Sequence, residues 1–127
     1  MSLERILAVG LGGGLGAILR YTASSWVYGR FPGSFPMGTL AVNAVGCFLI
    51  GGLWAFLDAS EGTSEGARLF VGVGFLGGLT TFSTFGQETV ALAENGETKL
   101  ACLSVALNVA VGLFAVLTGR ATARLFF

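Results

Sequence analysis

Residues 77–88 read GGLTTFSTFGQE and interrupt a chain that otherwise consists largely of Leu, Val, Ala and Gly. Four hydroxyl residues surround two phenylalanines in this stretch: Thr80, Thr81, Ser83 and Thr84 with Phe82 and Phe85. The two leading glycines lower helix propensity, and Ser and Thr hydroxyls can take over backbone hydrogen bonds. We therefore expect a helix that breaks near residues 77–81.

The composition around this stretch indicates a membrane protein. Of the 127 residues, 54% are hydrophobic and 11% are charged, with a mean hydropathy of +0.80, whereas soluble domains carry about 25% charged residues. A spanning helix needs about 20 predominantly apolar residues, and the chain offers four such stretches. We predict an all-α membrane protein with four transmembrane helices, the third of them broken. It forms a single domain of residues 1–127, with spans at about 4–28, 37–57, 67–93 and 99–123.

The residue inventory disfavours an enzyme. The loops between spans are too short for a soluble domain, so function must reside among the helices. Histidine is absent, which removes the commonest general base and metal ligand. Cys47 and Cys102 fall within predicted spans, where cysteine is ordinarily a small hydrophobe. We expect surrounding lipid, no nucleic acid partner and, because glycines and Arg20 interrupt the first apolar stretch, no cleaved signal peptide.

The positive charges leave the orientation in the membrane open. One side carries Arg5, Arg68, Arg120 and Arg124, and the other carries Arg30 and Lys99, with Arg20 near its edge. The positive-inside rule needs a clear excess of Lys and Arg on one side, so we expect both orientations to insert. Two oppositely inserted copies can pair about a two-fold axis in the membrane plane. We therefore expect an antiparallel, dual-topology homodimer.

Small and polar residues recur at helical spacing on the other spans. The first span has Gly10, Gly12, Gly13, Gly14 and Gly16, which favour close helix packing in lipid. Residues three or four apart share a face, as do Thr39, Asn43 and Gly46 on the second span and Ser104, Asn108 and Gly112 on the fourth. A mid-span amide is costly unless it is paired. Each stripe therefore either joins helices by hydrogen bonds or lines a polar path.

The residues around the break could bind a cation or an anion. Carbonyl oxygens exposed at membrane depth must be buried in protein or face a wet cavity, and a cluster of them suits a hard cation. Phe82 and Phe85 present their rings on one face, where they either pack or turn their positive edges toward an anion. Arg20 either snorkels to the headgroups or marks an ion path. If the ring edges face an anion, the amide and hydroxyl donors nearby suit one that is small and strongly hydrated.

Taken together, these residues resemble the CrcB/Fluc family of fluoride channels over nearly the whole chain. The matching motifs are GGGLGAILRY (residues 12–21), GTLAVNAVGCFLIG (38–51) and GGLTTFSTFGQE (77–88). The resemblance implies a dual-topology dimer of four-helix subunits, in the plasma membrane or the cell inner membrane. Two parallel pores at the subunit interface would let fluoride leave the cytoplasm passively.

The resemblance also implies roles for individual residues. Phe82, Phe85, Asn43, Ser83 and Thr84 match pore residues, Arg20 and Glu88 match polar residues near the pore ends, and the polar stripes add Thr39, Ser104 and Asn108 as candidates. The backbone carbonyls of Gly77 and Thr80 from both subunits would hold one structural Na⁺ on the two-fold axis. The fourth span departs from the aromatic, hydroxyl-rich stripe of the family, so the course of the ion along this helix stays open.

Two interpretations from other classes compete with a channel. A small multidrug transporter is also an antiparallel four-helix dimer, but it needs a membrane-embedded carboxylate for proton coupling. Glu4 is terminal and Glu88 is expected at a span end, which disfavours this class. An assembly subunit that does not transport would explain Gly12 and Gly16 but not the cluster of hydroxyls and phenylalanines.

Overall fold

Four helical segments of the computed structural model are long and apolar enough to cross a membrane. The structure describes residues 2–60 and 62–127, and the four segments are Leu3–Arg30, Met37–Ala59, Glu65–Glu94 and Thr98–Ala123. Within the described ranges every regular element is helical. The expectation of an all-helical, multi-pass membrane protein is thereby confirmed.

Three of the four segments are continuous helices with short connections. They are α1 (Leu3–Arg30), α2 (Met37–Ala59), which begins directly after Pro36, and α6 (Thr98–Ala123). The turn into α6 depends on Gly96, whose φ of +80° is a conformation that glycine adopts without strain. There the backbone N–H of Gly96 donates to Ala93 and that of Glu97 to Leu92. This pair of bonds is a Schellman motif, which satisfies carbonyls at a helix end.

The third segment is divided into four elements. It begins with α3 (Glu65–Arg68), continues as the π-helix η1 (Leu69–Leu76) and ends its first half with α4 (Gly77–Leu79). Thr80 and Thr81 are extended, with ψ of 157° and 122° respectively, and α5 (Phe82–Glu94) follows. The break predicted near residues 77–81 is therefore present. The π-helix was not predicted.

Glycines bring neighbouring helices into backbone contact. A Cβ added to Gly12 would collide with the carbonyl of Phe70, and one added to Gly16 with that of Phe75. Contacts of this kind are what small residues provide in lipid, where no hydrophobic effect drives helices together. The packing role expected of the first span is thus confirmed for these two glycines. Gly10 and Gly14 instead have open space around them.

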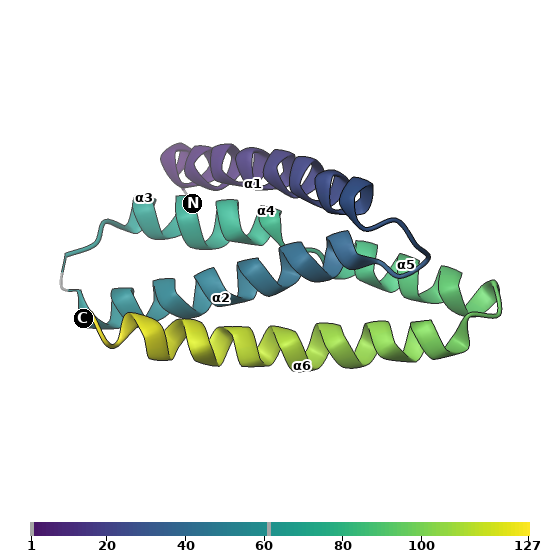
Figure 1. Ribbon diagram of the computed structural model, residues 1–127. Helices are drawn as coiled ribbons and strands as arrows, with labels where there is room; N and C mark the ends of the chain where they lie inside the picture. The colour runs from purple at the N-terminus through teal and green to yellow at the C-terminus, as the bar shows by residue number, and fades with distance from the viewer. Residues whose placement is uncertain (1, 61) are drawn as a thin grey trace.

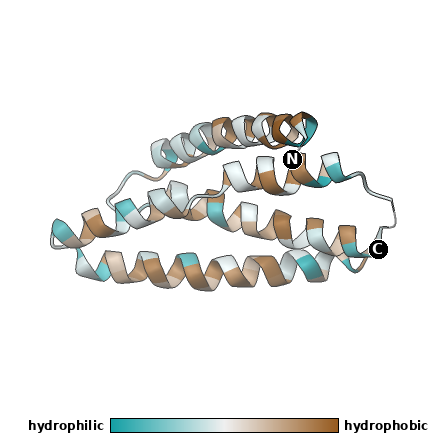
Figure 2. Ribbon diagram, turned by 180° about the vertical axis from the view of Figure 1, so that it is seen from behind, coloured by the Kyte–Doolittle hydropathy of each residue, from teal (hydrophilic) through white to brown (hydrophobic). Residues whose placement is uncertain are grey.

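The helices form two pairs that α5 connects. In Figure 1, α1 lies along α3 and α4, whereas α2 lies along α6, and the strongest helix contacts are α2 with α6 and α1 with η1. Both chain ends and the connection between α2 and α3 lie at one end of the molecule, and the other two connections lie at the opposite end. Figure 2 shows hydrophobic residues over much of the length of the helices, and many large apolar side chains are exposed, among them Leu15, Val109 and Leu113. This pattern suits a surface surrounded by lipid.

Candidate functional site

The extended backbone at Thr81 is held by one side chain of α2. Asn43 Oδ1 accepts from the Thr81 N–H at 2.8 Å, and Asn43 Nδ2 donates to the Thr81 carbonyl at 3.0 Å. Its second N–H donates to Asn108 Oδ1 on α6, also at 3.0 Å. A broken helix in lipid must have its free backbone groups satisfied by protein. The Asn43 amide does this and joins three helical segments, so both of its donors are in use.

Hydroxyl groups form further hydrogen bonds around the break. Thr80 Oγ1 donates to the Leu76 carbonyl at 3.2 Å, next to the last turn before the break. Thr81 Oγ1 accepts from the Thr84 N–H at 3.2 Å and donates to Thr84 Oγ1 at 3.0 Å, while Ser83 Oγ lies 3.3 Å away. Thr81 is thus the N-cap of α5, a position that Thr favours. Sequence reasoning did not single out Thr81 as a site residue, although a Thr placed directly before a helix is a recognisable capping signal.

A cavity of about 230 Å³ opens beside the break. The residues that line it come from α2, the break, α5 and α6: Asn43, Cys47, Thr80, Thr81, Phe82, Phe85, Asn108 and Val109. The two phenylalanine rings lie 5.4 Å apart between centroids, as their spacing predicted. They differ in environment, because Phe82 is 83% exposed and Phe85 only 8%. On the outer side of this cavity the Phe82 ring therefore lies on the surface of the protomer, as does Val109, which is 54% exposed.

The polar stripe of the fourth span forms helix contacts. Ser104 is completely buried, and its Oγ lies 3.0 Å from Thr89 Oγ1 of α5. Asn108 Nδ2 donates to the Ser104 carbonyl at 3.0 Å, while its Oδ1 accepts from Asn43. A Cβ on Gly112 would touch Cys47 Sγ at 3.6 Å. The shared face is confirmed, and in this protomer its residues bind other helices; Thr89 was missed because its partner is on another helix.

A second cavity, of about 270 Å³, lies on the other side of Thr81. Its walls include Arg20, Thr39, Thr81, Thr84 and Glu88. The guanidinium of Arg20 donates through Nη1 to the Thr80 carbonyl at 3.2 Å, so the arginine binds the break directly. The structure thus brings together candidates from the first, second and third spans.

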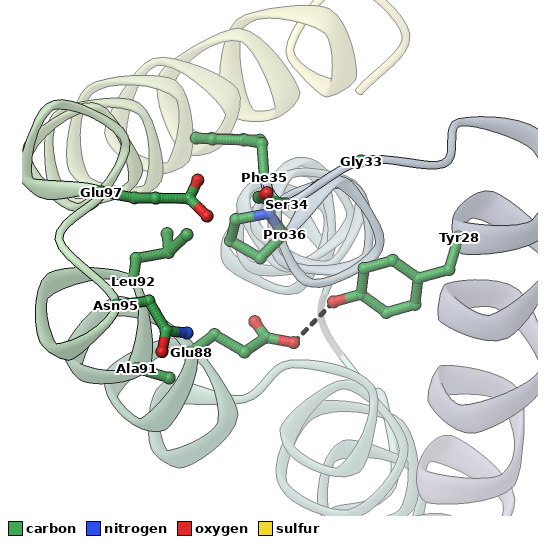
Figure 3. A pocket seen from close by; sticks show the side chains of 10 residues that line it. All are labelled: Tyr28, Gly33, Ser34, Phe35, Pro36, Glu88, Ala91, Leu92, Asn95 and Glu97. Atoms are coloured by element: carbon green, nitrogen blue, oxygen red, sulfur yellow. Dashed lines mark hydrogen bonds between the residues drawn. The ribbon is translucent and has the colours of Figure 1, made fainter.

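Glu88 lies on α5, which continues to Glu94. Its Oε1 accepts from the hydroxyl of Tyr28 at 2.6 Å, and that hydroxyl also lies 3.0 Å from Thr39 Oγ1. Glu88 and Tyr28 also line a third cavity, of about 340 Å³, at the end of the helices (Figure 3). No sequence pattern pointed to Tyr28, because it stands in the last turn of α1 with no partner at helical spacing.

The cavities combine polar groups with apolar walls, and among the described residues no group of three or more His, Cys, Asp or Glu side chains could hold a metal ion. Hydroxyls, amides and one guanidinium offer hydrogen-bond donors on both sides of Thr81. Phe82 and Phe85 add an apolar wall. Such a lining can exchange hydrogen bonds with a small ion, as channel filters do.

Comparison with known proteins gives one family. Residues 7–120 match the family described as CrcB-like protein, Camphor Resistance (CrcB). Three similar proteins are each named Fluoride-specific ion channel FluC. The one from Acidobacterium capsulatum is 45% identical over 91% of this chain and 92% of its own length. The one from Shewanella halifaxensis is 45% identical over 93% and 94%, and the one from Clostridium perfringens 44% identical over 95% and 94%. Proteins with this name are ion channels and not enzymes, and the chain belongs to the CrcB-like family.

Proposed function

We propose that this protein is a channel that lets fluoride leave the cytoplasm passively through the plasma membrane or the cell inner membrane. The observation that carries the proposal is the break at Thr80 and Thr81. It places hydroxyls, an amide and two aromatic rings along cavities at membrane depth. The names of the similar proteins support the choice of ion.

Fluoride holds its hydration water strongly, so the lining must replace those hydrogen bonds without trapping the ion. Thr84 has an exposed hydroxyl that accepts from Thr81 and keeps its own proton for an ion, whereas the exposed hydroxyl of Ser83 can donate to an ion only by giving up its contact with Thr81. The positive ring edges of Phe82 and Phe85 supply further electrostatic attraction. Asn43 donates to the ion only by exchanging one of its present bonds, since both of its N–H groups are in use. The cation of Arg20 raises the local concentration of anions.

Two copies in antiparallel orientation complete the proposed channel. Phe82 stands on the protomer surface, 83% exposed, and Gly77, on the other side of the break, is also exposed and has open space around it. A second copy covering this face would enclose the cavity beside Phe82, and the two-fold axis would generate a second, parallel pore. The 270 Å³ cavity with Thr39, Arg20 and Glu88 would continue the path toward one pore end.

The dual topology is tested by labelling a Phe127→Cys variant in which Cys47 and Cys102 are replaced by Ala. In intact cells, about half of the chains should react with a reagent that does not cross the membrane. Full reaction or none would show a single orientation and would contradict the antiparallel dimer.

A structural Na⁺ on the two-fold axis would be held by the carbonyls of Gly77 and Thr80 from both copies. The donor set fits a hard cation, and the Thr81 N–H that would ordinarily bind the Gly77 carbonyl donates to Asn43 instead. The Thr80 carbonyl already accepts from Arg20, which leaves one of its two lone pairs. When bound, the cation would supply only charge and geometry to the dimer.

The channel function is tested by fluoride efflux from liposomes that contain only this protein. Phe82→Ile and Phe85→Ile should each reduce the flux at least tenfold, because an aliphatic side chain has no positive edge. Leu113→Ile, on the exposed face of α6, is the control and should conduct normally. Near-normal flux in both phenylalanine variants would refute the role of the rings.

The buried carboxylate of Glu88 makes a proton-coupled carrier worth testing beside the channel. The Oε2 atom of Glu88 is buried, and a membrane-embedded carboxylate is what proton coupling requires. Liposomes with an imposed proton gradient should take up no cationic dye if the chain is a channel. Proton-driven dye uptake without fluoride flux would support the carrier.

A further inference from the structure

We propose that Tyr28 is a positioning residue for the fluoride path. Its hydroxyl holds the carboxylate of Glu88 against α1. This position weakens the electrostatic repulsion between the carboxylate and a passing anion. The inference rests on the proposed function and adds to it a residue that no resemblance implied.

The directions of the hydrogen bonds follow from the number of protons. A phenol has one proton, and an ionised carboxylate can only accept. The Tyr28 hydroxyl therefore donates to Glu88 Oε1, at 2.6 Å, and Thr39 Oγ1 donates to Tyr28, at 3.0 Å. Thr39 is 2% exposed, so its hydroxyl has little access to other partners. In this series of hydrogen bonds, from Thr39 through Tyr28 to Glu88, both protons are donated in the direction of the carboxylate.

The pair also lies where two cavities meet. Tyr28 and Glu88 line both the cavity of about 270 Å³ next to Arg20 and the cavity of about 340 Å³ at the end of the helices. Figure 3 shows the Glu88 carboxylate turned toward the Tyr28 hydroxyl, with Asn95 and Glu97 elsewhere around the outer cavity. An ion that moves from one cavity to the other must pass this pair.

The electrostatics at this position make the orientation of Glu88 important. A carboxylate repels an anion, and at low effective dielectric this repulsion is strong at close range. Arg20 is the cation in the inner cavity, and Glu97 adds a second acid to the outer one. Glu88 Oε2 is buried and has no hydrogen-bond partner in the part of the chain that the structure describes. The Tyr28 hydroxyl is therefore the contact that fixes this carboxylate.

The first test is Tyr28→Phe, which keeps the ring and removes only the hydroxyl. We expect the fluoride efflux rate to fall by roughly tenfold, in line with the strength of hydrogen bonds to charged groups. Thr22→Val is the matched control, because it also removes one hydroxyl from α1, and the Thr22 hydroxyl binds only carbonyls of its own helix. An equal effect of the two substitutions, or no effect of Tyr28→Phe, would overturn the inference.

A second test separates positioning from a structural role of the ring. The Tyr28→Phe substitution is made in the wild-type protein and in the Glu88→Gln variant, and each efflux rate is divided by that of the protein with Tyr28 in the same background. Once the charge is gone, loss of the hydroxyl should change the efflux rate by less than about twofold. A tenfold loss in both backgrounds would show that Tyr28 acts through the fold and not through Glu88.

The melting temperatures of the wild type, the two single variants and the double variant measure the contact between Tyr28 and Glu88 without a fluoride assay. The effects of the two substitutions should be non-additive, as for residues in direct contact, and additive effects would overturn the inference. A wild-type protein that passes no fluoride while its melting temperatures remain coupled would contradict the proposed function. The two failures can therefore be told apart.

Discussion

The third span meets its neighbours in two different ways. Along η1 and α4 it touches α1 through bare backbone, since Gly12 and Gly16 leave no room for a Cβ against the carbonyls of Phe70 and Phe75. At the break and beyond it, the span binds α2 and α6 through side-chain hydrogen bonds, such as those of Asn43 to Thr81 and of Thr89 with Ser104. In the first half, glycines without side chains let the helix backbones pack closely. In the second half, side chains form the hydrogen bonds that the broken helix backbone cannot form with itself. Steric changes should therefore damage the first half most, and loss of hydrogen bonds the second.

The largest effect is expected for Gly16→Val. Its added atoms would meet the backbone of Phe75 and Leu79, which cannot move away as a flexible side chain can, so overpacking should cost about 3 kcal/mol or more. We expect almost no monodisperse protein by size-exclusion chromatography in detergent. Gly14→Val, on the same helix with nothing within 4 Å of an added Cβ, should be recovered normally. Similar yields of the two variants would show that close backbone contact does not hold α1 in place.

Gly77→Val should separate the fold of the protomer from assembly. Gly77 has ordinary helical angles, φ −64° and ψ −35°, and open space around it within the protomer. The proposed dimer with its Na⁺ site would place a second copy there, so we expect a folded chain whose dimerisation is weakened more than tenfold. Energy transfer between labelled protomers in liposomes measures this. A dimer of normal strength would count against the sodium site.

Asn43→Ala tests the second half of the comparison. The substitution leaves the N–H and carbonyl of Thr81 without partners at a residue that is 6% exposed, which should cost about 2–4 kcal/mol. Asn108→Ala removes only one of the bonds of Asn43 and should cost less. Thermal unfolding in detergent compares the two. An Asn108 variant that is the less stable of the pair would mean that the break is supported mainly from α6.

The smallest effect is expected for Ser104→Ala. The fully buried Ser104 loses its bond to Thr89, and interhelical bonds of this kind contribute about 0.6 kcal/mol in membranes. Thr118→Val is the control, because the Thr118 hydroxyl binds only carbonyls of its own helix. Its unfolding temperature should stay within error of the wild type. A larger loss for Thr118→Val would remove the distinction between bonds within and between helices.

Much of this arrangement could be predicted because it depends on local sequence. Twenty-residue apolar stretches predict spans, and two glycines followed by hydroxyl residues predict a break at Thr80 and Thr81. The spacing of Phe82 and Phe85 also predicted that their rings would lie together. Each of these inferences uses residues within one or two helical turns of each other.

The remaining features depend on which helices meet. That Asn43 binds the backbone of Thr81, and that Tyr28 binds Glu88, requires residues 38 and 60 positions apart to be neighbours. The different exposure of Phe82 and Phe85 likewise depends on where α2 and α6 lie. The π-helix shares its composition with an ordinary apolar helix, so helical periodicity alone does not reveal it.

The polar start of α5 has a consequence for how the protein is made. Ser83, Thr84, Gln87, Glu88 and Thr89 all fall within its first eight residues, and such a segment partitions poorly into lipid on its own. Tyr28, which binds Glu88, is made earlier on α1, but Ser104, which binds Thr89, belongs to α6 and leaves the ribosome later. The second half of the third span is therefore expected to wait beside the insertion machinery until the last helix emerges, and to enter the bilayer together with it.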